Sequence, residues 1–172
     1  PTLVQNGVLF VESTPKGGLV SGQSSVLRLN GKPWTQAALS QEAALHVFWP
    51  DFSPERIEGD PAANKAWSKR SQLRKERLQQ LEETLADAQA GRLGQAYDVW
   101  RKVISGEQLL MLHASGAREA LEAMAWLDTR PNIRWALVDC FDPMPLLPEL
   151  KTRNIPIVLS RIWELPYASD AD

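Results

Sequence analysis

Three short apolar runs recur at nearly regular intervals in the second half of the chain, at residues 109–113, 134–139 and 157–159. A run that is apolar throughout is typical of a strand buried on both faces of a parallel sheet. A helical pattern separates the first two runs, and the spacing leaves room for only short crossovers. The sequence therefore predicts an α/β fold of parallel βα units, with residues 109–113, 134–139 and 156–160 as adjacent strands joined by right-handed crossovers.

Other parts of the chain carry weaker patterns. Residues 8–12 have the composition and punctuation of a buried strand, and the alternation in residues 25–29 predicts a half-exposed strand. The segment 16–25, rich in glycine and serine, has the composition of an anion-cradling loop. It matches no phosphate-binding motif, so a plain flexible connection is the alternative. Thr35 is placed to cap a helix through Ala44, before an extended run at 45–49.

Helices are predicted at residues 64–90, 95–105 and 116–128 from the spacing of their apolar side chains. A long surface loop rich in proline and glycine precedes the first of them, at residues 50–63. Asp142 is placed to cap a further short helix, and Pro148 is expected to limit its length. We expect one α/β domain over residues 1–172, because a chain of this length buries a sufficient core without disulfides or metal ions.

The charge balance excludes some functions. The chain has 19 basic and 21 acidic residues, which argues against a nucleic-acid-binding surface. The basic stretch of the helix at 64–90 is balanced by acidic residues further on, so a solvent-exposed face is predicted there. The chain has no apolar run of the roughly 18 residues that a membrane span needs. With one cysteine, Cys140, an internal disulfide is excluded.

His113 ends the apolar strand at 109–113. In parallel α/β folds, ligands bind at the carboxyl ends of the strands, where a histidine serves as a metal ligand or a general base. The alternative is a buried histidine bonded to a backbone carbonyl. His46 is the only other histidine and faces either the core or a pocket. Two histidines without further ligands do not complete a zinc site, so the spacing alone demonstrates no metal centre.

Asp139 and Asp142 flank Cys140 at the end of the next strand. A carboxylate pair at this place binds a metal ion or acts as acid and base. The alternatives are a strand-end hydrogen bond for Asp139 and helix capping for Asp142. Cys140 is either a thiol activated by a spatial neighbour such as His113 or an inert buried side chain.

Two further strand ends carry polar pairs, which are Glu12 with Ser13 and Ser160 with Arg161. Trp49, one of seven tryptophans, follows the extended run at 45–49. Tryptophans are predicted to pack in the core, although Trp49 and Trp163, near strand or loop ends, are also placed to line an aromatic pocket.

Several segments also occur in a familiar order: 17–27 (GGLVSGQSSVL), 43–50 (AALHVFWP), 85–90 (LADAQA), 110–114 (LMLHA), 155–159 (IPIVL) and 165–166 (LP). Together they resemble the imidazolonepropionase-like branch of the amidohydrolase superfamily, whose members are metal-dependent hydrolases built on a (β/α)8 barrel. The resemblance covers nearly the whole chain. It implies that the chain is the central part of such a barrel, beginning after the first barrel strand and stopping before the eighth.

The resemblance also implies site residues and a cofactor. His113 matches the metal-binding histidine of the fifth barrel strand. The family places another histidine on the next strand, where this chain has Asp139 and Cys140. The His-x-His motif of the first strand and the aspartate of the last strand have no counterpart in these 172 residues. We therefore expect a divalent metal ion, with zinc favoured, in the full-length protein and none tightly bound to this chain.

Three functions follow as hypotheses. The first is part of a metal-dependent amidohydrolase that acts on a non-peptide C–N bond in a cyclic amide or related small molecule, with Asp139 as the catalytic carboxylate. The second is a non-catalytic amidohydrolase-like barrel that serves binding or assembly. The third, a small flavodoxin-like ligand-binding domain, requires the chain to be a complete protein.

The partner expected is a small-molecule substrate, with no nucleic acid and no membrane. An exposed sheet edge predicts self-association. Proteins of this family are often exported, so the resemblance implies an exported or periplasmic location as one expectation, while the residues themselves leave the compartment open.

Overall fold

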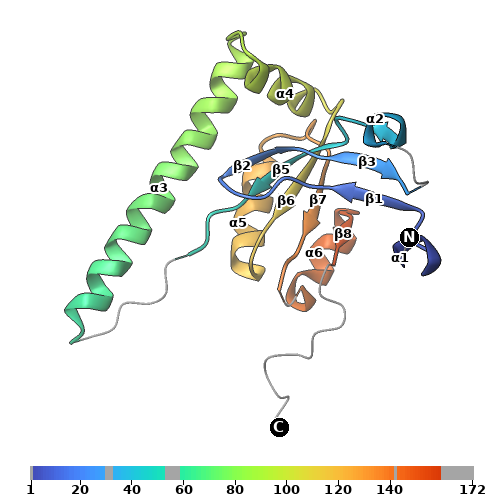
Figure 1. Cartoon of the computed structure of the whole chain (residues 1–172). Helices are drawn as coiled ribbons and strands as arrows, with labels where there is room; N and C mark the ends of the chain where they lie inside the picture. Colours follow the sequence, from blue (N-terminus) through green and yellow to red (C-terminus); the bar gives the residue numbers. More distant parts are fainter. Residues whose placement is uncertain (1, 30–32, 53–58, 142, 160–172) are drawn as a thin grey trace.

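The fold combines two β-sheets with helices that cover one side of the larger sheet (Figure 1). The computed structural model describes residues 2–29, 33–52, 59–141 and 143–159. The strands of the larger sheet are β2 (Val20–Gln23), β5 (Ala44–Phe48), β6 (Leu109–His113), β7 (Trp135–Val138) and β8 (Ile157–Val158). Those of the smaller sheet are β1 (Phe10–Ser13), β3 (Ser25–Arg28) and β4 (Ala38–Ser40).

The helices precede or connect these strands. They are α1 (Thr2–Gln5), α2 (Trp34–Ala37), α3 (Pro61–Gln89), α4 (Gln95–Ile104), α5 (Ala117–Asp128), the 3₁₀ helix η1 (Met144–Leu146) and α6 (Leu147–Thr152). The predicted helices at 64–90, 95–105 and 116–128 are confirmed as α3, α4 and α5. Helix α3 begins three residues earlier than expected, because Asp60 caps it by accepting from the Ala63 amide at 2.9 Å and Pro61 fits its first turn.

The larger sheet has the strand order β2-β5-β6-β7-β8. Strands β5, β6, β7 and β8 are parallel, and β2 joins β5 in the antiparallel sense. The predicted adjacency of the strands near 109–113, 134–139 and 156–160 is therefore confirmed within the described residues. The α/β fold class of parallel βα units holds. The sheet is open, as in part of a barrel, with β2 and β8 as its outer strands in the part of the chain that the structure describes.

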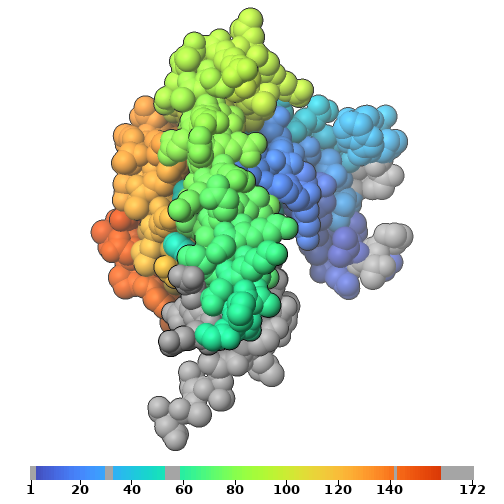
Figure 2. Space-filling view, turned by 90° about the vertical axis from the view of Figure 1, so that its left-hand side faces the viewer, coloured from blue at the N-terminus to red at the C-terminus, as the bar shows by residue number. Residues whose placement is uncertain are grey.

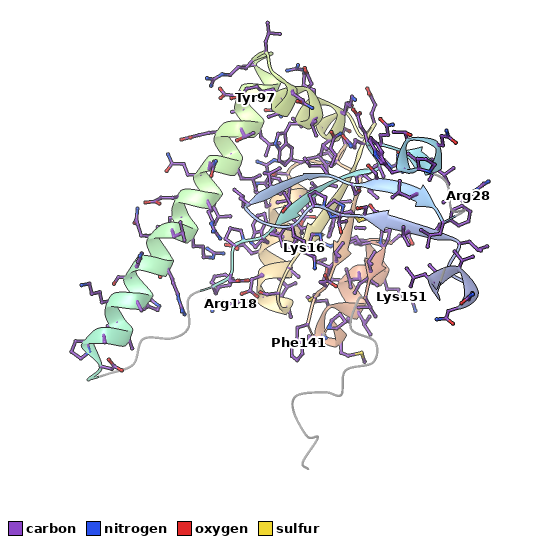
Figure 3. All side chains as sticks on the ribbon, in the orientation of Figure 1. Lys16, Arg28, Tyr97, Arg118, Phe141 and Lys151 are labelled. Atoms are coloured by element: carbon purple, nitrogen blue, oxygen red, sulfur yellow. The ribbon has the colours of Figure 1, made fainter. Side chains whose placement is uncertain are left out.

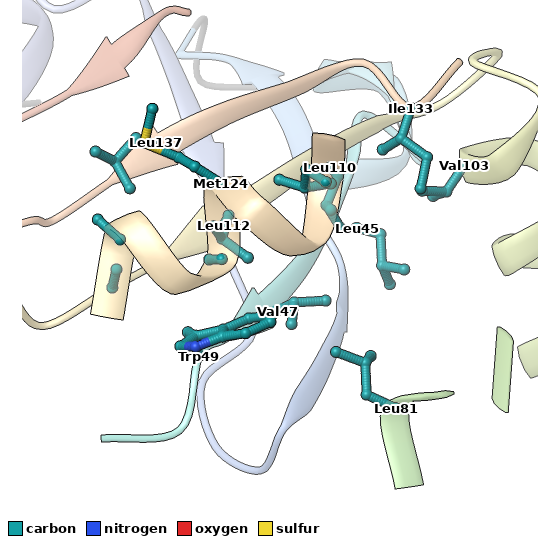
Figure 4. Close-up of a cluster of buried hydrophobic side chains, with 14 of the residues drawn as sticks. Leu45, Val47, Trp49, Leu81, Val103, Leu110, Leu112, Met124, Ile133 and Leu137 are labelled. Atoms are coloured by element: carbon teal, nitrogen blue, oxygen red, sulfur yellow. The ribbon is translucent and has the colours of Figure 1, made fainter. Parts of the chain in front are cut away.

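The hydrophobic core lies between the larger sheet and its helices (Figure 4). Strand side chains alternate between the two faces, and the members that point toward the helices are almost fully buried. They are Leu45, Val47, Leu110, Leu112 and Leu137, each at most 2% exposed. Helices α4 and α5 supply Val103 and Met124 from the other side. Burial of this one face fixes the register of β5, β6 and β7, because their apolar side chains must lie side by side on it.

Helix α3 runs along the outside of the molecule (Figure 2). Its buried residues are Leu81, Leu85 and Ala88, all in its last third. The preceding part, which holds the basic stretch, has no fully buried side chain. This agrees with the prediction of a solvent-exposed face except at Arg74, whose side chain is 14% exposed and forms an ion pair with Glu122. Among the described helices, none is long and apolar enough to cross a bilayer.

Several local predictions were wrong. Residues 20–23 form β2 rather than a loop, because pairing with β5 overrides the glycine and serine composition. The strand predicted at 8–12 exists as β1, but it is not buried, and its Phe10 is 50% exposed. The helix expected from Thr35 to Ala44 is only α2, since its chain turns into β4 at Ala38.

Two predictions near the end of the chain also need correction. Pro148 does not end a helix. It lies in the first turn of α6, which follows η1 directly. Strand β6 is not buried on both faces: Leu110 and Leu112 are fully buried, whereas Met111 and His113 on the opposite face are only partly buried. Asp142, Ser160, Arg161 and Trp163 lie outside the described residues.

Removal of a core side chain tests this packing. We expect Leu112→Ala to lower the free energy of unfolding by about 2 to 5 kcal/mol, because it removes apolar contacts and leaves a cavity. Leu121→Ala on α5 is the matched control, since Leu121 is 49% exposed and surface changes stay within about 0.5 kcal/mol. Urea unfolding followed by circular dichroism measures both. Equal losses would contradict the proposed core.

Two glycines that follow helix ends form a second test. Gly91 after α3 and Gly106 after α4 share φ +80°, a conformation that favours glycine. A Cβ on Gly106 would lie 2.7 Å from the backbone oxygen of Asn132, whereas Gly91 faces open space. We expect Gly91→Ala to cost about 1 to 2 kcal/mol and Gly106→Ala to cost clearly more, as measured by urea unfolding. A larger loss for Gly91→Ala would contradict the close approach at Gly106.

Candidate functional site

The candidate site lies on the face of the larger sheet that does not pack against the helices. Parallel pairing places His46 opposite Met111 and Phe48 opposite His113. Because residues two apart in a strand share a face, these four side chains lie together, on the face opposite Leu110 and its buried neighbours. Register and alternation thus bring both histidines of the sequence to one place.

The two imidazoles are in direct contact. His46 Nδ1 and His113 Nε2 are 2.9 Å apart, and the ring planes are inclined by 39°. The ring of Phe48 stacks on His113 at a centroid distance of 4.0 Å, with 9° between the planes. His46 is 2% exposed. The side chains around the pair therefore fix the orientation of both rings.

A carboxylate faces the outer nitrogen of each imidazole. Glu12 Oε1 lies 3.5 Å from His46 Nε2, and Asp139 Oδ2 lies 3.8 Å from His113 Nδ1. The buried Ser24 hydroxyl donates to Glu12 Oε1 at 2.6 Å and holds that carboxylate in place. Both outer nitrogens are buried and lack a hydrogen-bond partner among the described residues. The separation from Glu12 is at the limit of hydrogen-bond distance, and the separation from Asp139 is just beyond it.

Asp139 reaches this position through an unusual backbone conformation. It follows β7 directly and has φ +56°, in the left-handed region that aspartate tolerates better than most residues. Its amide donates to the Val158 carbonyl at 3.1 Å, so the turn is tied to β8. Strained backbone of this kind is often found at functional sites.

Both imidazoles are held neutral. Burial, followed by repulsion from a charged His46, lowers the pKa of His113 to about 4, against weaker opposing effects of Asp139 and Glu12. The charge of Lys16, which lies over the sheet in the view of Figure 3, acts in the same direction as burial. Burial also lowers the pKa of His46, although Glu12 opposes it. At neutral pH the pair therefore offers unprotonated ring nitrogens.

These residues fit a metal ion in part. Neutral imidazole nitrogens are preferred ligands of zinc, and a carboxylate beside the outer nitrogen is the usual second partner of a metal-binding histidine. However, the described residues contain no group of three or more His, Cys, Asp or Glu side chains arranged to hold a metal ion. The chain thus supplies two nitrogen donors, and a closed site needs further ligands.

The structure places the predicted site residues as follows. His113 and Asp139 come together, as their positions at neighbouring strand ends suggested. Cys140 is buried at 5% exposure, and its thiol points to the Phe141 carbonyl at 3.6 Å, which agrees with the reading of a buried thiol. Asp142 is not described, so the pairing of Asp139 with Asp142 is untested.

Three other outcomes concern residues treated as secondary in the sequence. His46 and Glu12 belong to the site, although the sequence alone did not join them to His113. The missing information was strand register, because His46 and His113 are 67 residues apart. Trp49 packs in the hydrophobic core, where it is 4% exposed, and its indole donates to Glu122 at 2.6 Å.

Comparison with known proteins identifies the architecture. The sequence matches no family model and no curated protein. The structure is similar to that of an amidohydrolase from Thermotoga maritima MSB8, with a TM-score of 0.74 and 13% sequence identity. The match covers 94% of this chain and 44% of that chain, so this chain spans less than half the length of the matched structure. The likeness shows that the chain has the fold of part of an amidohydrolase structure.

The lowered pKa of His113 predicts a pH dependence of stability. The imidazole binds a proton near pH 6.5 in the unfolded chain and near pH 4 in the folded chain. Between these values the unfolded state holds more protons, so stability falls as the pH is lowered from about 6.5 to about 4. We expect this fall to be smaller in His113→Asn, which keeps every carboxylate. Urea unfolding of both proteins across this range measures it, and parallel profiles would contradict the burial of a neutral imidazole.

Proposed function

We propose that this chain is the central part of a metal-dependent amidohydrolase barrel of the imidazolonepropionase-like branch. Its substrate would be a small molecule with a non-peptide C–N bond, such as a cyclic amide. The observation that carries the proposal is His113, a neutral imidazole at the carboxyl end of a barrel-like strand, with Nε2 directed toward a second imidazole. The fold likeness to an amidohydrolase and the sequence resemblance support the same class.

The residues of this chain would have distinct roles in such an enzyme. His113 would hold the metal ion, with zinc favoured, and Phe48 would keep its ring in place by stacking. A bound divalent metal lowers the pKa of water and polarises a carbonyl oxygen. Asp139, whose side chain is 39% exposed, would accept a proton from the substrate side on the carboxylate oxygen that does not face His113. The remaining ligands would come from chain outside these residues.

A non-catalytic barrel that serves binding or assembly is the second candidate. Two observations favour it. Asp139 and Cys140 stand where the family places another histidine, and the described residues form no group of three metal ligands. In this case the histidine pair would be a remnant of the site. The predictions of a small-molecule partner, of no nucleic-acid or membrane binding, and of self-association through an open sheet edge remain untested.

Turnover distinguishes the two candidates. The complete protein that contains this chain is supplied with zinc and assayed against a panel of cyclic amides. We expect hydrolysis, and we expect His113→Asn to lower kcat/KM by at least about 100-fold while the melting temperature of the metal-free protein changes by only a few degrees. Such a loss is of the size seen when a group acting at the transition state is removed.

Leu93→Ala serves as the control, because Leu93 is 86% exposed and distant in sequence from the site. It should retain full activity. Absence of hydrolysis by the zinc-loaded wild-type protein on the whole panel would favour the non-catalytic barrel. Full activity in a folded His113→Asn protein would remove His113 from the mechanism.

A further inference from the structure

Strand β2 and helix α3 enclose a groove that the candidate site does not use. Its volume is about 410 Å³, which is within the range typical of small-molecule sites. Figure 2 shows this side of the molecule, with β2 in blue beside α3 in green. The lining comes from the turn into β2 and from one side of the helix, and it includes Gly18, Leu19, Val20, Arg77, Gln80 and Leu81. None of the lining residues is acidic, so the groove suits an anion.

The strand wall of the groove offers an open backbone N–H. The Leu19 carbonyl accepts from the Phe48 amide at 2.9 Å, so this carbonyl points toward β5. In a trans peptide the carbonyl and the following amide point in opposite directions. The Val20 amide therefore points away from β5. In the part of the chain that the structure describes, β2 pairs only with β5 in its sheet, so this amide lies on an open edge.

The turn before β2 leaves its backbone accessible. Gly17 and Gly18 have φ +108° and +77°, in the region that favours glycine. The Ser21 hydroxyl donates to the Gly17 carbonyl at 2.7 Å, so the Gly18 amide on the same peptide points away from Ser21. That amide donates to no other backbone group among the described residues. Backbone amides in such turns form concavities that bind anions.

The helix wall supplies a cation and a further donor. Arg77 lines the groove and forms no ion pair with any carboxylate in the described ranges. A guanidinium binds phosphate oxygens through two parallel hydrogen bonds. Gln80 lies three residues further along α3, so its side-chain amide is next to Arg77 on the helix surface. Between the two walls, the side chains of Leu19 and Leu81 are 8% and 1% exposed and give the groove an apolar floor.

We propose that this groove binds the phosphate group of a small molecule. The Arg77 guanidinium and the amides of Gly18 and Val20 hold the phosphate oxygens, while Leu19 and Leu81 contact the uncharged remainder of the ligand. Phosphate fits better than a carboxylate, because its additional oxygen atoms accept from both walls of the groove at once. No residue of the candidate site lines the groove, so the proposal does not depend on the proposed function.

The first experiment locates the phosphate on this chain. Backbone ¹H–¹⁵N spectra are recorded during titration with inorganic phosphate, and separately with phenyl phosphate, at constant ionic strength. We expect saturable shifts of the Gly18 and Val20 amides in both titrations. Tighter binding of phenyl phosphate would support a phosphate ester as the ligand, and equal affinities would support free phosphate. Shifts that do not saturate at millimolar phosphate, or that leave both amides unchanged, would overturn the proposal.

The second experiment separates this site from the general charge of α3. Arg77→Gln should weaken phosphate binding by at least about tenfold, because it removes a charged hydrogen-bond donor. Lys75→Gln is the matched control, since it also removes one positive charge from an exposed side chain of α3 but lies outside the groove lining. It should bind phosphate as the wild type does.

Circular dichroism establishes that both variants remain folded, as expected for changes at exposed positions. A selective loss of affinity in folded Arg77→Gln supports the groove as the binding site. Equal weakening in the two variants would show a diffuse attraction to the basic stretch of α3 and would overturn the proposal. Unchanged affinity in Arg77→Gln would overturn it as well.

Discussion

The alternation of side chains along β5, β6 and β7 is the constraint on which the rest of the structure depends. One face of these strands is leucine and valine, and its burial against α3, α4 and α5 fixes the register of the sheet. Because the register is fixed by apolar packing, the opposite face can carry polar groups without loss of the fold. The histidine pair lies on that second face. The site is therefore positioned by side chains that it does not itself contact.

Much of the fold was predictable from the sequence, because it follows from local patterns. Strand β6, helices α4 and α5 and the parallel order of β6, β7 and β8 come from apolar spacing and from the short intervals between runs. The failures occurred where tertiary pairing overrides composition. Residues 20–23 contain glycine and serine but pair with β5, and Phe10 is apolar yet exposed. Neither outcome is encoded in the neighbouring residues alone.

The site was predictable only in part, for a related reason. The position of His113 at a strand end, and of Asp139 at the next, follows from the order of elements. The contribution of His46 depends on which residue of β5 lies beside which residue of β6, and a shift by one position would turn His46 into the helix-packed core. Glu12 is still less accessible to sequence reasoning, because it comes from the other sheet.

The two carboxylates of the site have different origins, and this has a mechanical consequence. Glu12 belongs to β1 of the three-stranded sheet, whereas Asp139 follows β7 of the five-stranded sheet. The chain of contacts from one carboxylate through both imidazoles to the other thus crosses between the sheets. Any occupant of this site that binds only the folded chain also strengthens the junction of the sheets, by thermodynamic linkage. Separation of the two sheets and emptying of the site would therefore be coupled equilibria.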